Sequence, residues 1–503
     1  MAVAASGLTS TARASRFTPV SASMALNTLQ YDLLIIGAGV SGSALLYATA
    51  RYTDIGHIGI IEKYAAPARV NSLSSNNSQT LHCGDIETNY TLEKALKVQR
   101  AARMLANYCL NQPDRDHLIY AYPKMVLGVG ERECELLRAR FEQLQPHYPD
   151  LKLFEKKDIA RIEPAVVAAR HGGLRDEPIV ALGSTDEYTA VNFEALSRSF
   201  VRRACQVEGK TVDVFYNENI RRIDIEEDRF LLSSDTTCYQ TRALVVCAGG
   251  HSLKLAHDLG YGRHYSCLPV AGSYYFTPQV LNGKVYTVQN DKLPFAAIHG
   301  DPDVLVPGKT RFGPTALILP ILERYNYRTL PDFLRVLQFD RRVARALWDL
   351  LRVPDIRNYM FKNMLFEIPL IRKILFLKDA RKIVPSLRYR DLGFAKKVGG
   401  IRPQLIDKTQ GRLLMGEAKI DTGKGAIFNM TPSPGGTSCL ENAEIDMRAV
   451  ARFLGANIDE QLLREELLGA DVEHGHEHFA GHLLADRPRQ VSRFRRLLDR
   501  FRS

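Results

Sequence analysis

The strongest hydrophobic pattern lies close to the amino end of the chain. A continuous apolar run at 31–36 stops at glycines and predicts a fully buried parallel strand. Small and apolar residues over 43–52 predict a helix, and the run 58–61 predicts a second strand that closes at Glu62. Strand, helix and strand in this order make one βαβ unit, which places the chain in the α/β class.

The rest of the chain alternates between helical and strand periodicity, without a repeat of solenoid type. The stretch 329–382, rich in Arg, Leu and Phe, has a helical pattern throughout. Strand patterns cover 212–216, 220–225, 230–232, 243–247, 273–312 and 400–420, and further helices are predicted at 91–110, 132–144 and 440–453.

Gly37, Gly39 and Gly42 form a G-x-G-x-x-G between the first strand and its helix. The first glycine permits a tight turn, the second lets the backbone approach a pyrophosphate, and the third lets the helix pack closely on the strand. Amides at the helix start would face the phosphates. Glu62, 23 residues after Gly39, would accept hydrogen bonds from the adenosine ribose. The unit predicts a Rossmann-type dinucleotide site, for either FAD or NAD.

A chain of 503 residues, 45% of them apolar, is long enough to bury a core in two connected domains. Its formal net charge of +11 is typical of proteins that bind nucleic acid, anionic membranes or acidic small molecules. The eight cysteines never form a C-x-x-C pair, which argues against zinc and against a disulfide framework and fits a reducing compartment. The sequence therefore predicts no metal site.

Much of the positive charge lies beside apolar helical residues. Residues 341–390 contain 13 Lys or Arg against four acids, a net of +9, and 487–502 contain seven arginines against one acid. Basic helices with apolar faces bind an anionic bilayer without crossing it, and no apolar run is long enough for a transmembrane helix. We expect peripheral membrane contact and no nucleic-acid binding, because the charge is not interleaved with stacking aromatics. A solvated face over a core stripe, or an oligomer contact, is the alternative for 341–390, and disorder is the alternative for the tail.

The first thirty residues contain Arg13 and Arg16, many Ser, Thr and Ala, and no acid. This composition suits a mitochondrial transit peptide. A disordered leader, or a start nearer Met24, fits equally well.

The polar segment 75–91 carries Asn76-Asn77, Thr80, His82 and Glu87-Thr88-Asn89-Tyr90. It resembles the corresponding segment of malate:quinone oxidoreductases and, less closely, of L-2-hydroxyglutarate dehydrogenases in the same glycine-oxidase-like flavoprotein superfamily. Other segments that resemble the family are 190–196, 244–250, 269–272, 293–301, 312–314 and 433–438.

This resemblance implies FAD as the cofactor and a Rossmann-type FAD-binding domain interleaved with an antiparallel-sheet substrate domain that carries a helical basic insertion. We expect a leader at 1–30, the FAD-binding domain at 31–110, 185–265 and 395–455, the substrate domain at 111–184 and 266–394 with its basic region at 329–390, and a tail at 456–503. The implied cofactor contacts are Gly37, Gly39, Gly42, Glu62, Asn76, Asn77, Ser78, Ala248, Gly249, Gly435, Gly436 and Thr437.

Oxidation of a 2-hydroxy acid needs a base for the hydroxyl proton, a flavin for the hydride, and cations or amides for the carboxylates. The resemblance puts His82 and His299 near the reactive face of the flavin. His299 is the favoured base, with Asp301 as its orienting partner, and a role as a core histidine is the alternative for each. Arg402, expected in a turn, suits a bidentate grip on a carboxylate. Further candidates for substrate contact are Gln79, Thr80 and Asn192.

The resemblance implies oxidation of (S)-malate to oxaloacetate, with electrons passed through FAD to a membrane quinone. It places the enzyme on the inner mitochondrial membrane of a eukaryote, or otherwise on the cytoplasmic face of the cell membrane. The alternatives are an FAD-dependent L-2-hydroxyglutarate dehydrogenase, another 2-hydroxy or amino acid oxidase, and a flavin-containing nucleic-acid-binding protein.

Overall fold

The structure, a computed structural model, describes residues 28–289, 298–369, 371–414, 418–432 and 434–469. The transit-like residues 1–27 and the arginine-rich segment 487–502 lie outside this part of the chain. Its α-helices are α1 (Val40–Tyr52), α2 (Leu92–Leu110), α3 (Glu131–Leu144), α4 (Lys156–Ile162), α5 (Pro164–Val167), α6 (Phe193–Ala204), α7 (Gly250–Asp258), α8 (Leu330–Leu337), α9 (Arg341–Arg352), α10 (Pro354–Leu365), α11 (Arg372–Ile383), α12 (Cys439–Leu454) and α13 (Glu460–Leu463).

One end of the molecule is built on an eight-stranded sheet that contains the predicted first strand. Leu33 of β1 lies beside Ile58 of β2 and Ala243 of β11, and both neighbouring strands run parallel to β1. The predicted βαβ unit is therefore confirmed. The order of the sheet is β21 (Ala418–Asp421), β22 (Ala426–Met430), β11 (Cys238–Val246), β1 (Thr28–Ile36), β2 (His57–Glu62) and β8 (Thr211–Tyr216), and a hairpin of β9 (Arg222–Glu226) and β10 (Arg229–Ser233) pairs with β11.

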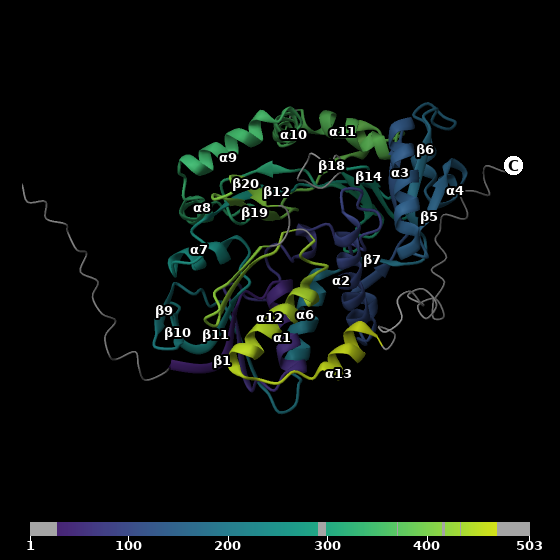
Figure 1. Cartoon of the computed structure of the whole chain (residues 1–503). Coiled ribbons are helices and arrows are strands. Elements are labelled where there is room, and N and C mark those ends of the chain that lie inside the picture. The colour runs from purple at the N-terminus through teal and green to yellow at the C-terminus, as the bar shows by residue number, and fades with distance from the viewer. Residues whose placement is uncertain (1–27, 290–297, 370, 415–417, 433, 470–503) are drawn as a thin grey trace, which may run out of the picture.

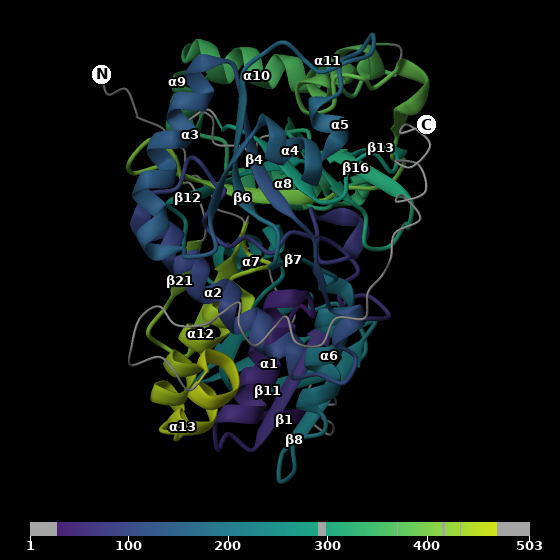
Figure 2. The same cartoon turned by 90° about the vertical axis from the view of Figure 1, so that its right-hand side faces the viewer.

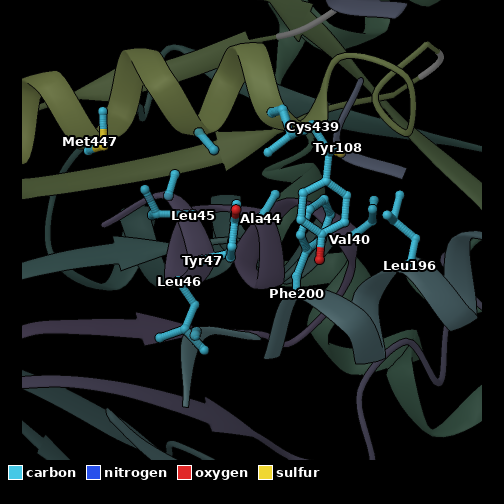
Figure 3. Packing of buried hydrophobic residues seen from close by; sticks show 14 of the residues in the cluster. Val40, Ala44, Leu45, Leu46, Tyr47, Tyr108, Leu196, Phe200, Cys439 and Met447 are labelled. Carbon is cyan, nitrogen blue, oxygen red and sulfur yellow. The ribbon is translucent and has the colours of Figure 1, made fainter. Parts of the chain in front are cut away.

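Both faces of this sheet are buried, which explains the continuous apolar run of β1. Leu33 and Ile35 belong to a core shared with α1, α6 and α12, whereas Leu34 and Ile36 belong to a second core shared with β10 and α7. Figure 3 shows the first core, in which side chains of α1 pack between those of α6 and α12. Alternate residues of one strand thus fill two separate cores.

The other end of the molecule contains two further sheets. The larger runs in the order β18 (Gly393–Phe394), β13 (Tyr275–Pro278), β16 (Lys309–Gly313), β15 (His299–Pro302), β14 (Lys284–Thr287), β4 (Lys124–Val129), β6 (Ile179–Ser184) and β5 (Lys152–Glu155), and is antiparallel except between β14 and β4. The smaller runs β17 (Leu317–Ile318), β12 (Tyr265–Ala271), β19 (Ile401–Asp407) and β20 (Arg412–Leu414), while β3 (Ile119–Ala121) pairs with β7 (Tyr188–Val191). β19 and β20 fall in the range expected for the cofactor domain, yet they pair with β12 from the other range.

The predicted helical run 329–382 is divided into the four helices α8 to α11. Gln338 has a left-handed φ of 42° after α8, and the Asp340 carboxylate then accepts the amides of Arg342 and Val343 at 2.8 Å each, which starts α9. Pro354 opens α10, where its missing N–H is not needed. Helical periodicity alone does not mark these breaks.

Helices α9 to α11 lie over the four-stranded sheet and the larger antiparallel sheet, at the end of the molecule opposite α1 (Figures 1 and 2). Val343 of α9 packs with Leu268 and Ile406 of the four-stranded sheet, and the Phe376 ring of α11 stacks on Tyr275 at 4.0 Å between centroids. Among the described residues, no helix has the length and apolar character needed to cross a bilayer.

Candidate active site

A cavity of about 440 Å³ lies at the carboxyl ends of β1, β2 and β11, where these strands face β12 and β19. Open α/β sheets bind their ligands at this edge. All the predicted cofactor contacts line the cavity except Gly42, and Thr80, His82 and Arg402 line it as well. Residues far apart in the sequence therefore meet around one space.

The glycine turn is packed too tightly for side chains. Gly37 has a φ of +99°, and a Cβ on it would lie 2.6 Å from the backbone oxygen of Cys247. A Cβ on Gly42 would lie 2.0 Å from the backbone oxygen of Gly37. Gly42 thus supports the turn from beneath the cavity and lets α1 approach β1 closely.

The start of α1 has amides available for an anion. Ser72 Oγ accepts a hydrogen bond from the amide of Val40 at 2.9 Å. The amide of Ser43 donates to the carbonyl of Gly39, also at 2.9 Å. The amides of Ser41 and Gly42, in the first turn, are left for a ligand. This arrangement fits a phosphate group at the helix amino terminus.

Glu62 ends β2 on the cavity wall. Its Oε2 accepts the amide of Ala38 at 2.8 Å and its Oε1 accepts the amide of Tyr64 at 3.0 Å. Burial raises the pKa of this carboxyl above its usual value, although the two amides oppose the shift. Each oxygen keeps a lone pair for a hydroxyl donor, so the turn, the helix start and the acid together fit a dinucleotide cofactor.

The asparagines of the polar segment hold its loop in place. Asn76 Nδ2 donates to the carbonyl of Val70 at 2.7 Å, and Asn77 Nδ2 donates to those of Leu73 at 2.9 Å and Asn71 at 3.1 Å. Both amide groups are therefore used within the loop, and they fix the backbone that lines the cavity.

The segment before α12 closes another side of the cavity. A Cβ on Gly436 would lie 2.8 Å from the Phe193 ring, and Thr437 Oγ1 accepts the amide of His82 at 3.0 Å. The amino terminus of α12 therefore begins at the cavity, where its positive dipole end favours negative charge.

Two histidines line the cavity: His251, which lies 3.6 Å from Asp332 and 3.9 Å from Glu323, and His82. Nδ1 of His82 lies 2.6 Å from Oε1 of Glu87, and no described residue hydrogen-bonds to its Nε2. The Glu87 carboxylate also accepts the amide of Gly84 at 3.0 Å. Burial opposes the charge of Glu87, but the hydrogen bond from His82 holds the pKa of this carboxyl below its usual value.

A buried group of charges lies behind this pair. The Lys124 ammonium is 2.7 Å from Asp85 and 2.5 Å from Glu187, and all three side chains are largely or fully buried. Burial, together with the negative charges of Glu187 and Glu87, raises the pKa of Asp85 to about 6, although the Lys124 ammonium opposes the shift. The segment that carries His82 is thus anchored by ionic contacts to β4 and to the turn before β7.

His299, the favoured base from sequence, does not line the cavity. It is 2% exposed, its ring stacks on Tyr286 at 4.2 Å, and its Nε2 lies 3.3 Å from Oδ1 of Asp301. Asp301 in turn lies 3.5 Å from Arg311 and 3.6 Å from Lys284. The expected His299–Asp301 contact is present, but in a buried ionic cluster.

Arg402 lies in strand β19 rather than in the expected turn, and its Cα pairs with that of Val270 in β12. A Cβ on Gly272 would lie 3.9 Å from its guanidinium. It forms no hydrogen bond or ion pair with any described residue, whereas the buried Arg311 is paired with Asp301 and Asp303. An unpaired guanidinium on a cavity wall is suited to binding a carboxylate.

The three weaker substrate candidates have different positions. Gln79 is fully buried and donates to the carbonyl of Ser74 at 3.0 Å, while Asn192 caps α6 by accepting the amide of Ala195 at 3.1 Å. Neither lines the cavity, because each amide serves local backbone instead of a ligand. Thr80 does line it, with its Oγ1 2.9 Å from the Tyr286 hydroxyl.

Two residues that contact the site were not among the site residues predicted from the sequence. Glu87 lies five residues after His82 in a segment already singled out, so its spacing was a usable signal. Ser72 caps α1 from a separate loop, and nothing in the sequence marks that contact.

Comparison with known proteins identifies the family. A profile described as "Malate:quinone oxidoreductase (Mqo)" matches residues 29–446. The chain belongs to the malate:quinone oxidoreductase family. A probable malate:quinone oxidoreductase of Campylobacter jejuni is 49% identical over 87% of this chain and 99% of its own length, and a malate:quinone oxidoreductase of Helicobacter pylori is 43% identical over 89% and 100%. The resemblance seen in the motifs is thereby confirmed.

More distant matches define the fold class. The mitochondrial L-2-hydroxyglutarate dehydrogenase of Homo sapiens is 24% identical over 83% of this chain and 88% of its own length. Glycine oxidase from Geobacillus kaustophilus superposes with a TM-score of 0.59 at 16% identity, over 84% of this chain and 95% of its own. L-α-glycerophosphate oxidase from Mycoplasma pneumoniae, solved with FAD bound, gives 0.56 at 20% identity, over 85% and 96%. The malate:quinone oxidoreductase family member described here thus has the fold of the glycine oxidase type, as the sequence predicted.

Proposed function

We propose that this protein oxidises (S)-malate to oxaloacetate with FAD and passes the electrons to a quinone. The observation that carries the proposal is the unpaired guanidinium of Arg402 on the cavity that also contains the dinucleotide turn and His82. The family assignment supports the same reaction. Bacterial relatives lend no support to the expected mitochondrial location.

The chain supplies binding and acid–base groups around the cofactor. The amides of Ser41 and Gly42 and the carboxylate of Glu62 hold the dinucleotide. Bound FAD supplies a two-electron acceptor for the hydride on C2. Arg402 binds one carboxylate of malate through two parallel hydrogen bonds, which orients C2. His82, on the same cavity, can take the hydroxyl proton.

L-2-Hydroxyglutarate is the second candidate substrate, because a dehydrogenase for that acid is a distant relative. It differs from malate by one methylene, which an apolar contact distinguishes by only about 1–3 kcal/mol. Both acids would use Arg402 in the same way.

Steady-state assays of purified protein with a soluble quinone test the proposal. We expect turnover with (S)-malate and a kcat/KM about tenfold or more above that for L-2-hydroxyglutarate. Dye reduction by neither acid, from protein that contains flavin, would contradict the proposed reaction. Preference for L-2-hydroxyglutarate would assign the second candidate.

We also propose that the protein contacts a membrane through the region of α8 to α11. We define their docking face by its exposed apolar side chains, of which Trp348 is 60% and Phe361 58% exposed. The complete set is Leu330, Leu334, Phe339, Trp348, Leu351, Val353, Phe361, Met364, Ile368, Ile371 and Ile374. Arg341, Arg345 and Arg352 are exposed beside it and form no ion pair with described residues. Such a surface suits an anionic bilayer, where a quinone is dissolved.

The docking face lies close to the side of the cavity that contains Arg402. Tyr359 of α10 packs with Val270 of β12, and Val270 is the Cα partner of Arg402. A bilayer against these helices would therefore lie over the sheet that presents Arg402.

Vesicle flotation tests this face. The wild-type protein should float with vesicles of phosphatidylcholine and phosphatidylglycerol and should be released as salt is raised. The double variant Trp348→Ser/Phe361→Ser should bind roughly 100-fold more weakly, because two large apolar side chains contribute about 3 kcal/mol. Leu174→Ser, which changes a 62% exposed leucine elsewhere, is the matched control. Equal flotation of all three proteins would refute the assignment of the face.

A further inference from the structure

His82 and His299 are the two candidates for the base, and their access to the cavity differs. His82 lines the cavity through a side chain that is 13% exposed, with Nδ1 directed to Glu87. The side chain of His299 is 3% exposed and its ring is stacked on Tyr286. A base must come within hydrogen-bond reach of the proton that it takes, which favours His82.

The charges behind the two histidines differ as well. Behind His82, the ammonium of Lys124 is engaged by Asp85 and Glu187, whereas Glu87 contacts His82 itself. Burial raises the pKa values of the neighbouring Cys83 thiol and of the Tyr148 and Tyr286 hydroxyls. Among the described residues, the Glu87 carboxylate therefore has no lysine or arginine within ion-pair distance.

His299 faces a balanced set of charges. Asp301 and Asp303 are compensated by Lys284 and Arg311, which lie within 3.6 Å of one or both carboxylates. A positive charge formed on His299 would gain little from an aspartate that is already paired. A positive charge formed on His82 would instead meet the Glu87 carboxylate, which has no lysine or arginine partner among the described residues.

We propose that His82 is the base and that Glu87 is the residue that positions it, an assignment that rests on the proposed oxidation of malate. Nε2 of His82 takes the hydroxyl proton as the O–H bond breaks. The C2–H bonding pair leaves as a hydride to the oxidised flavin, and C2 and its oxygen become the carbonyl of oxaloacetate. Nδ1–H of His82 donates a hydrogen bond to Glu87 and keeps its proton, which presents Nε2 to the cavity with a free lone pair.

The hydrogen bond between the two residues orients the imidazole. Nδ1 of His82 lies 2.6 Å from the Glu87 carboxylate, and this hydrogen bond lowers the pKa of Glu87. Loss of that carboxylate should therefore weaken proton abstraction and leave the binding of substrate carboxylates unchanged.

The test uses flavin-loaded protein mixed with (S)-malate without oxygen, with flavin bleaching recorded. For Glu87→Gln we expect the bleaching rate to fall about 100-fold, because the neutral amide no longer orients Nδ1 of His82 as the carboxylate does. The malate concentration at half-maximal rate should stay near that of the wild type. His82→Gln should bleach slower still, while its flavin absorbance and its reduction by dithionite stay normal.

Glu187→Gln is the matched control, because it removes a carboxylate of the same buried group that does not contact His82. We expect it to lower the melting temperature while keeping most of the bleaching rate. An unchanged bleaching rate or a much higher half-maximal malate concentration in Glu87→Gln, or rapid bleaching in His82→Gln, would overturn the assignment. A wild-type protein that binds FAD and is not bleached by malate would instead refute the proposed function.

Discussion

Arg402→Ala is expected to lower kcat/KM for malate by roughly 1000-fold. Two charge-assisted hydrogen bonds to a carboxylate contribute about 4 kcal/mol in total. Because Arg402 has no partner among the described residues, its removal leaves no buried carboxylate unpaired, and the fold should keep its stability. The measurements are steady-state kinetics with a soluble quinone and a thermal melt.

Arg402→Lys separates charge from geometry at the same position. A lysine keeps the positive charge but offers no planar pair of donors, so we expect an intermediate loss. Arg412→Ala, on the exposed strand β20 beside β19, is the matched control and should behave like the wild type. Unchanged kcat/KM in Arg402→Ala would mean that the carboxylate is bound elsewhere.

Gly42→Ala is expected to abolish flavin binding. The added Cβ would lie 2.0 Å from the carbonyl oxygen of Gly37, and the clash is with backbone, which cannot swing aside like a side chain. Relief requires α1 to move away from β1, which displaces the amides that face the phosphates and destabilises the fold by about 1–3 kcal/mol. Purified protein should lack the visible flavin absorbance and should not acquire it with added FAD.

Gly56→Ala is the control for this substitution, since it lies between α1 and β2, where an added Cβ would come no closer than 3.9 Å to Asp32. It should retain flavin and activity. A yellow, active Gly42→Ala protein would contradict the cofactor position proposed here.

Packing explains why His82 reaches the cavity and His299 does not. Both belong to motifs that resemble the family, and the sequence alone favoured His299. His299 lies in β15, whose neighbours place Asp301 and Arg311 beside it under Tyr286. His82 lies in a loop that Thr437 and Lys124 hold at the cavity. These neighbours come from distant parts of the chain, and no local pattern names them.

Local periodicity was enough to predict the βαβ unit, because the apolar run of β1 and the glycine spacing are properties of neighbouring residues. It also located the basic helical stretch, although the breaks at Gln338 and Pro354 depend on backbone geometry. Tertiary contacts decided the remaining positions. Pairing with β12 places Arg402 in β19 instead of a turn. The side-chain amides of Gln79 and Asn192 form hydrogen bonds with backbone groups. Side-chain roles at this cavity depend on contacts between residues hundreds of positions apart, and such contacts exist only once the chain has folded.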